Sequence, residues 1–142
     1  MPKSKKTPAS ATSRKDTKTV RTHEVRHSQR PSWRFSTVDL NGPFAWPVGA
    51  AIEVQILRKL QQFDSMNWRD IEGPDHHAIG VDRLSKEAQA RLTEIKQDDI
   101  DEVFSFHFAG KPRIIGIRDM NVVKLLWWDP EHLVCPSQKK NT

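Results

Sequence analysis

Basic and imidazole side chains gather in the last part of the chain, and their types suit chemistry on a phosphate group. Arg113, Arg118 and Lys124 lie along two short apolar segments, and His132 follows the second of them. The planar guanidinium fork of arginine matches phosphate oxygens, and histidine titrates near neutral pH, so that it can act as a general acid or base in RNA cleavage. The pattern therefore indicates a nucleic-acid or ribonuclease site as a hypothesis.

Simpler roles account for the same arginines. Surface arginines are common and protect the edges of sheets, so Arg113 and Arg118 are also interpretable as solvated charges. Their odd separation places them on opposite faces of an ideal strand, unless Gly116 between them marks a bulge. On this geometry, at least one of the two contacts phosphate if the functional interpretation holds.

His132 also has two interpretations. Pro130 restricts the backbone just before it, so the imidazole is held at the exit of the preceding strand. There it could serve in catalysis, or it could be a structural histidine that hydrogen-bonds a turn through Asp129 or Glu131.

Other kinds of site find little support. Cys135 is the single cysteine and lies beside Pro136, with no sign of an activated nucleophile, and no Gly-x-Ser-x-Gly elbow is present. We therefore expect no metal and no cofactor. The residues considered for a metal have no zinc-type spacing; they are Asp129, Glu131 and His132 together with His76, His77 or His107.

The Trp127-Trp128 pair resembles a platform on which bases stack. Adjacent residues of a strand point to opposite faces, however, so at most one of the two can face a ligand. Trp128 is kept as a candidate for RNA binding, although core packing explains both side chains.

Three β-type segments precede and include these residues. Val103–Phe108, Arg113–Arg118 and Val122–Trp128 are joined by connections so short that only hairpins can link them. The sequence thus predicts an antiparallel meander. Its third strand is apolar apart from Lys124, as expected of a strand that is covered on both faces.

Two helices are predicted ahead of the meander. One runs from about Val48 to Phe63, and the other begins after Ser85 as its N-cap and ends near Gln97. Residues 72–77 between them read as a loop, and residues 33–40 as a short strand or extended lead-in. The expected fold class is α+β, with two helices packed on a small antiparallel β-meander. The apolar stripes of the helices are Ile52, Ile56, Leu60 and Phe63 in the first, and Ala88, Leu92 and Ile95 in the second.

Charge divides the chain of 142 residues into two parts. Residues 1–34 hold 10 basic and 2 acidic side chains, whereas residues 35–142 hold 13 basic and 16 acidic ones. Residues 1–32 contain almost no large apolar side chain and are predicted to be a disordered basic tail. Residues 33–142 are predicted to form a single α+β domain. A lone cysteine and the lack of a signal or membrane-spanning stretch favour a cytoplasmic protein that does not bind a membrane.

The spaced motifs of the body resemble those of a group of small, uncharacterised bacterial proteins. The resemblance covers residues 33–142 and brings no function with it. It rests on Trp33–Ser36, Gly42–Phe44, Met66–Trp68, Leu84–Ala88, Arg113–Arg118 and the closing run Leu125–His132, which reads LLWWDPEH.

A more distant resemblance links residues 48–134 to the RelE/YoeB superfamily of toxin ribonucleases. It rests on the order of helix, helix and meander, on basic residues along the hairpin, and on a terminal histidine. It implies cleavage of messenger RNA on the ribosome by attack of the 2′-hydroxyl, without a metal. In that scheme Lys111 and Arg113 bind phosphate and stabilise charge, and His132 is the general acid. The chain departs from many members of the superfamily because it has no tyrosine.

Two functions follow as hypotheses. The first is a toxin endoribonuclease that acts on RNA or the ribosome and is neutralised by an antitoxin-like partner. Its catalytic residues are Arg113 and His132, and its RNA-binding residues are Lys111, Arg118, Lys124 and Trp128. The second is a non-catalytic adaptor that binds nucleic acid or protein through the basic tail, and the body could also be one half of an obligate complex.

Overall fold

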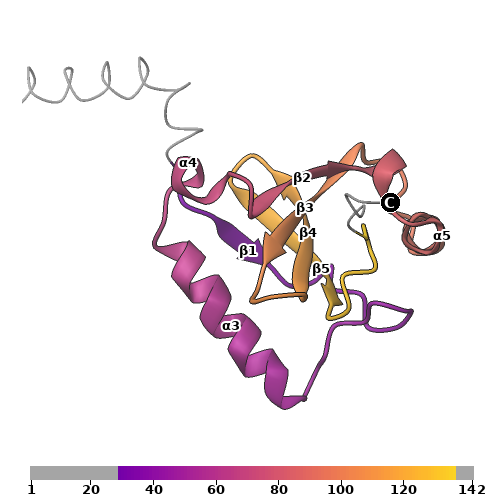
Figure 1. Cartoon of the computed structure of the whole chain (residues 1–142), viewed down its shortest axis with the longest axis horizontal. Helices are drawn as coiled ribbons and strands as arrows, with labels where there is room; N and C mark the ends of the chain where they lie inside the picture. Colours follow the sequence, from indigo (N-terminus) through magenta and orange to yellow (C-terminus); the bar gives the residue numbers. More distant parts are fainter. Residues whose placement is uncertain (1–28, 137–142) are drawn as a thin grey trace, which may run out of the picture.

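The structure, a computed structural model, describes residues 29–136 (Figure 1). The predicted tail therefore lies almost wholly outside the described residues, as do residues 137–142 of the predicted domain. Ser32, placed in the tail by the sequence, already begins the first strand. In chain order the elements are β1 (Ser32–Arg34), α3 (Ala51–Asp64), α4 (Trp68–Ile71), β2 (His76–Gly80), a 3₁₀ turn (Val81–Arg83), α5 (Lys86–Glu94), β3 (Glu102–His107), β4 (Arg113–Asp119) and β5 (Val122–Asp129).

The strands form one mixed sheet in the order β1-β5-β4-β3-β2. At its centre β3, β4 and β5 pair antiparallel in sequence order, as predicted for these three segments. β2 extends the meander antiparallel to β3, and β1 pairs parallel with β5 at the other edge. The α+β class is confirmed, but the predicted all-antiparallel sheet is wrong because of β1.

The two longer helices lie on opposite faces of this sheet, which the prediction of two helices on one meander did not specify (Figure 1). α3 buries Ile56, Leu60 and Phe63, which recur at helical spacing, against one face. α5 buries Ala88 and Leu92 against the other. Trp127 and Trp128 therefore enter different cores, so that each face of the sheet receives one large indole.

A bulge in β5 places the neighbouring residues Leu126 and Trp127 in the same core. Ile115 pairs with Trp127 whereas Gly116 pairs with Leu125, so Leu126 is the extra residue of β5. A Cβ at Gly116 would lie 2.6 Å from Val123 Cγ1, so the glycine allows close contact between the strands. The bulge predicted at Gly116 is thus present, although its extra residue lies in the partner strand.

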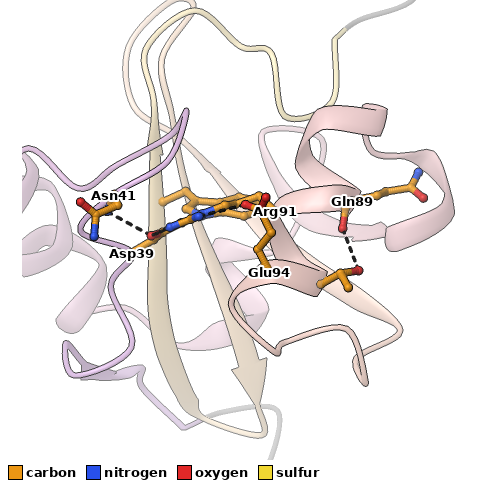
Figure 2. Close-up of polar contacts among 7 residues, drawn as sticks. Asp39, Asn41, Gln89, Arg91 and Glu94 are labelled. Carbon is orange, nitrogen blue, oxygen red and sulfur yellow. Dashed lines mark hydrogen bonds and ion pairs between the residues drawn. The ribbon is translucent and has the colours of Figure 1, made fainter.

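A buried carboxylate ties the segment between β1 and α3 to the core beneath α5 (Figure 2). Asp39 accepts hydrogen bonds from Arg91 Nε and Nη2 at 2.8 and 2.7 Å and from Trp127 Nε1 at 2.8 Å. Burial raises the pKa of Asp39, but these hydrogen bonds outweigh it, and the pKa lies below the ordinary 3.8. The ion pair therefore holds α5 to the strand β5 through the loop that carries Asp39.

The α5 helix begins as the sequence predicted. The hydroxyl of Ser85 accepts a hydrogen bond from the backbone N–H of Ala88 at 3.1 Å, as an N-cap does. The helix ends at Glu94, three residues before the predicted Gln97. Lys96, just beyond, has a positive φ of 58°, which is incompatible with a continuing helix.

Candidate active site

A pocket of about 690 Å³ opens on the α5 face of the sheet, near the turn where β3 ends and β4 begins. Its size is that of a site for a small molecule or a nucleotide. Its lining combines imidazoles and guanidinium groups with one carboxylate, one thiol and one hydroxyl. The residues that line it are Pro74, Asp75, His77, Ile79, Arg83, Ser105, His107, Arg113, His132, Cys135 and Pro136.

Three neighbouring strands form one wall of the pocket. His77 of β2 pairs with Ser105 of β3, and His107 of β3 pairs with Arg113 of β4. Paired residues share a face of the sheet, and alternate residues of one strand do so as well. The strands therefore bring His77, His107 and Arg113 to the same surface.

His132 is brought to the pocket by a tight turn after β5. The carboxylate of Asp129, which is only 1% exposed, accepts hydrogen bonds from the backbone N–H groups of Leu133 and Val134, each at 2.8 Å. His132 adopts the left-handed conformation with φ of 59°, which costs energy for a residue with a Cβ. The buried Asp129 therefore holds the backbone on the C-terminal side of His132, and this turn places the His132 side chain in the lining of the pocket.

The environment keeps the His132 imidazole neutral. Burial lowers the pKa of His132 below 6.5, the Arg113 guanidinium and His107 lower it further, and the Asp129 carboxylate opposes the shift. The influence of Arg113 shows that the two predicted catalytic residues lie near each other. A neutral imidazole is able to accept a proton at neutral pH.

Arg113 is anchored by the turn between β3 and β4. Its Nη1 donates hydrogen bonds to the carbonyl oxygens of Gly110, Lys111 and Pro112. Within residues 29–136 its Nε and Nη2 have no hydrogen-bond partner, so these donors are available to a ligand. The carbonyl oxygen of Gly110 also lies 3.1 Å from Nε2 of His107. A single turn thereby fixes the side chains of Arg113 and His107 relative to each other.

The other predicted RNA-binding residues do not line this pocket. Lys111 forms an ion pair with Glu131 at 3.0 Å between two turns, and both side chains are exposed. Arg118 lies at the far end of β4 on the opposite face. Lys124 lies at the same far end but on the α5 face, where it pairs with Ile117. The interpretation of Trp128 as a base-stacking platform is wrong, because its side chain is 7% exposed and packs against Phe108 in the core beneath α3.

Sequence reasoning missed half of the pocket because it missed β2. Residues 72–77 read as a loop, yet His76 and His77 begin a strand that pairs with β3. Without that strand, nothing placed Asp75 and His77 beside Ser105 and His107. The local signal was weak, since Ile79 is the one residue of β2 that favours a strand.

The described part of the chain holds neither a metal-binding group of side chains nor a helix suited to a membrane. Among residues 29–136, no three or more side chains of histidine, cysteine, aspartate or glutamate are grouped so as to hold a metal ion. None of the helices in that range combines the length and the apolar character needed to cross a bilayer.

Comparisons with family models, with curated proteins and with solved structures found no significant match to this chain. The resemblances drawn from the motifs therefore remain predictions, and the pocket itself is the basis for a proposed function.

Proposed function

We propose that the protein is an endoribonuclease that cleaves RNA through the pocket formed by Arg113, His107 and His132. The observation that carries the proposal is the meeting of these three side chains in one pocket. Two imidazoles and a fixed guanidinium group are the groups that cleavage by an internal hydroxyl requires.

The charge of the pocket supports a phosphate ligand. Arg83 and Arg113 line it against the single carboxylate of Asp75, so its permanent charges sum to a positive value. The free Nε and Nη2 of Arg113 form the fork that binds two phosphate oxygens at once. A partly enclosed pocket strengthens this attraction relative to an exposed surface.

In the proposed reaction the 2′-hydroxyl of RNA attacks the adjacent phosphorus. The bond from the 2′-oxygen to phosphorus forms, and the bond from phosphorus to the 5′-oxygen of the next nucleotide breaks. His132 accepts the proton of the 2′-hydroxyl, His107 protonates the departing 5′-oxygen, and Arg113 stabilises the charge on the phosphate. The products are a 2′,3′-cyclic phosphate and a 5′-hydroxyl end.

This assignment changes the role of His132 that the RelE/YoeB resemblance implied. A general acid must be protonated before the reaction, whereas the lowered pKa of His132 favours the neutral form. We therefore propose His132 as the base. Messenger RNA on the ribosome as substrate, and an antitoxin-like protein as partner, remain parts of the proposal that rest on the resemblance alone.

The test is to induce the chain in cells and map new RNA 5′ ends. We expect new ends in translated messages with the wild type and none with the Arg113→Ala/His132→Ala double variant. Arg58→Ala is the matched control, since Arg58 is an exposed residue of α3 on the other side of the sheet, and it should cleave like the wild type. New ends that persist in the double variant at equal expression would refute the proposed site.

Binding without cleavage is the second candidate function, and the separation of charge along the sequence favours it. The basic residues 1–34 would supply attraction to nucleic acid, and the affinity would then fall steeply with salt. A fluorescence titration of RNA with the full chain and with a chain lacking residues 1–28, which leaves β1 intact, distinguishes the two. Loss of all RNA binding in the shorter chain, with no cleavage by either, would favour the adaptor.

A further inference from the structure

At the end of the pairing between β2 and β3, a histidine side chain accepts the hydrogen bond that a backbone carbonyl would otherwise accept. The backbone N–H of His107 donates a hydrogen bond to Nδ1 of His76 at 3.0 Å. His76 pairs with Phe106 in the register of the two strands, and this is the last pair of the ladder. The His76 side chain therefore binds the backbone one residue beyond that pair. A backbone N–H can only donate, so Nδ1 of His76 must be unprotonated while the bond exists.

The surroundings of His76 oppose a positive charge on its ring. The ring packs edge-on against Phe63 of α3, with centroids 4.8 Å apart. Burial lowers the pKa of His76 below 6.5; Asp75 acts in the opposite direction, while Lys59, His107 and His77 lower the pKa further. These four residues are the charged and titratable groups that face His76 from β2, its preceding turn, α3 and β3.

We propose that His76 is a positioning residue for His107. The neutral imidazole of His76 holds the backbone of His107 through this hydrogen bond, and protonation of Nδ1 releases it. The consequence for catalysis rests on the proposed function, because His107 acts there as the acid. The latch itself, defined as the bond from the His107 N–H to Nδ1 of His76, does not depend on any substrate.

Protonation would place one N–H group directly against another. The hydrogen bond would be lost, and a new charge would lie close to Lys59 and against an aromatic ring. Among residues 29–136, β2 is an edge strand that pairs with β3 alone, so within that range no second strand holds the end of the ladder. His107 also pairs with Arg113, and both side chains contact the carbonyl of Gly110. Release at His76 would therefore loosen the wall of the pocket that carries the proposed acid.

Hydrogen exchange at the His107 amide, measured by NMR over a range of pH, tests the latch in the full chain. After correction for intrinsic exchange, the protection of this amide should fall about tenfold as the pH drops below 6.5 and through the pKa of His76. Amides of the central strand β4 serve as the internal reference and should keep their protection over the same range.

Two substitutions separate the hydrogen bond from the ring. His76→Asn keeps an acceptor oxygen close to the place of Nδ1 and does not titrate, so the protection of the His107 amide should become independent of pH. His76→Phe keeps the aromatic packing but removes the acceptor, so protection should be low at every pH. The same fall with pH in His76→Asn as in the wild type, or full protection in His76→Phe, would overturn the proposal. The wild-type and His76→Asn titrations decide the matter even if His76→Phe does not fold.

Cleavage assays on the same proteins give the second readout. We expect His76→Phe to lower kcat about tenfold with little change in KM, and His76→Asn to restore kcat. If the protein shows the predicted hydrogen exchange but cleaves no RNA, the latch is supported and the proposed function is rejected. If His76→Phe cleaves RNA with an unaltered kcat, His76 is not a positioning residue for catalysis.

Discussion

Arg113 and Arg118, the two arginines of β4, project to opposite faces of the sheet. Arg113 lines the pocket on the α5 face, whereas the guanidinium carbon of Arg118 lies 3.8 Å from the ring centroid of Trp68 in the core beneath α3. Arg118 also forms an ion pair with Glu72 at 3.1 Å. One arginine is thus available to a ligand while the other stabilises the fold.

The first prediction concerns the stability that Arg118 provides. Arg118→Gln should lower the free energy of unfolding by about 1–2 kcal/mol, because the cation over Trp68 is only 20% exposed and is partly desolvated. Glu72→Gln removes only the exposed ion pair and should cost about 0.5 kcal/mol or less. Urea unfolding followed by tryptophan fluorescence measures both. Equal losses in the two variants would contradict the importance of the contact with Trp68.

The second prediction concerns the buried carboxylate of Asp39. Asp39→Asn should lower the free energy of unfolding by about 2–3 kcal/mol, because hydrogen bonds to a charged group are lost and a partner is left unsatisfied. Glu94→Gln is the control, since Glu94 also pairs with Arg91 but its side chain is 64% exposed, and it should change stability by about 0.5 kcal/mol at most.

The pH dependence provides a further check on Asp39. Its pKa is lowered in the folded state, so its contribution is complete above the unfolded value near 3.8 and is lost as the pH falls through the folded value. Thermal unfolding from pH 7 to strongly acid conditions should show this loss in the wild type and a smaller loss in Asp39→Asn. Identical profiles would contradict the account.

The third prediction separates backbone strain from side-chain crowding at two glycines. Gly42 and Gly49 both have positive φ, of 86° and 82°. A Cβ at Gly42 would lie 2.4 Å from Arg91 Nε, whereas a Cβ at Gly49 would meet nothing within 4 Å. Gly49→Ala should therefore cost about 1 kcal/mol for the left-handed conformation alone. Gly42→Ala should cost roughly twice as much or more, since it also disturbs the pair of Arg91 with Asp39. Chemical unfolding of both variants decides it, and a Gly49→Ala loss equal to that of Gly42→Ala would argue against crowding.

The fourth prediction is the pH dependence of cleavage. His132 serves as a base only when neutral, and its pKa lies below 6.5. In His76→Asn, where the latch does not titrate, kcat/KM should therefore be independent of His132 above pH 6.5 and should fall tenfold per pH unit below the lowered pKa of His132. An acid limb centred above pH 6.5 would exclude His132, in this environment, as the base. Removing the Arg113 charge should move the limb to higher pH, because that charge lowers the pKa of His132.

The sequence predicted the elements whose patterns are locally strong. The apolar spacing in α3, the Ser85 cap of α5 and the short connections of the meander each follow from neighbouring residues. The opposite orientation of Arg113 and Arg118 also followed from the alternation of a strand, because the bulge lies in β5 and leaves β4 regular.

The edges of the sheet could not be predicted in the same way. β1 is three residues long and its residues pair with residues ninety positions away, so no local pattern specifies its parallel partner. β2 contains His76 and His77, which are poor signals of a strand, and it depends on β3 for its pairing. Since β2 carries part of the pocket wall, the site was predicted only from the C-terminal side, where Arg113 and His132 lie.

The most direct test of the central claim is the identity of the RNA ends made by the purified chain. A message that contains a mapped site would be incubated with the protein in a translation reaction, beside an identical message with one 2′-deoxy nucleotide at the cleaved position. We predict a 2′,3′-cyclic phosphate and a 5′-hydroxyl from the first, no cleavage of the second, and no products with His132→Asn. Cleavage at the 2′-deoxy position, or undiminished cleavage by His132→Asn, would contradict the account.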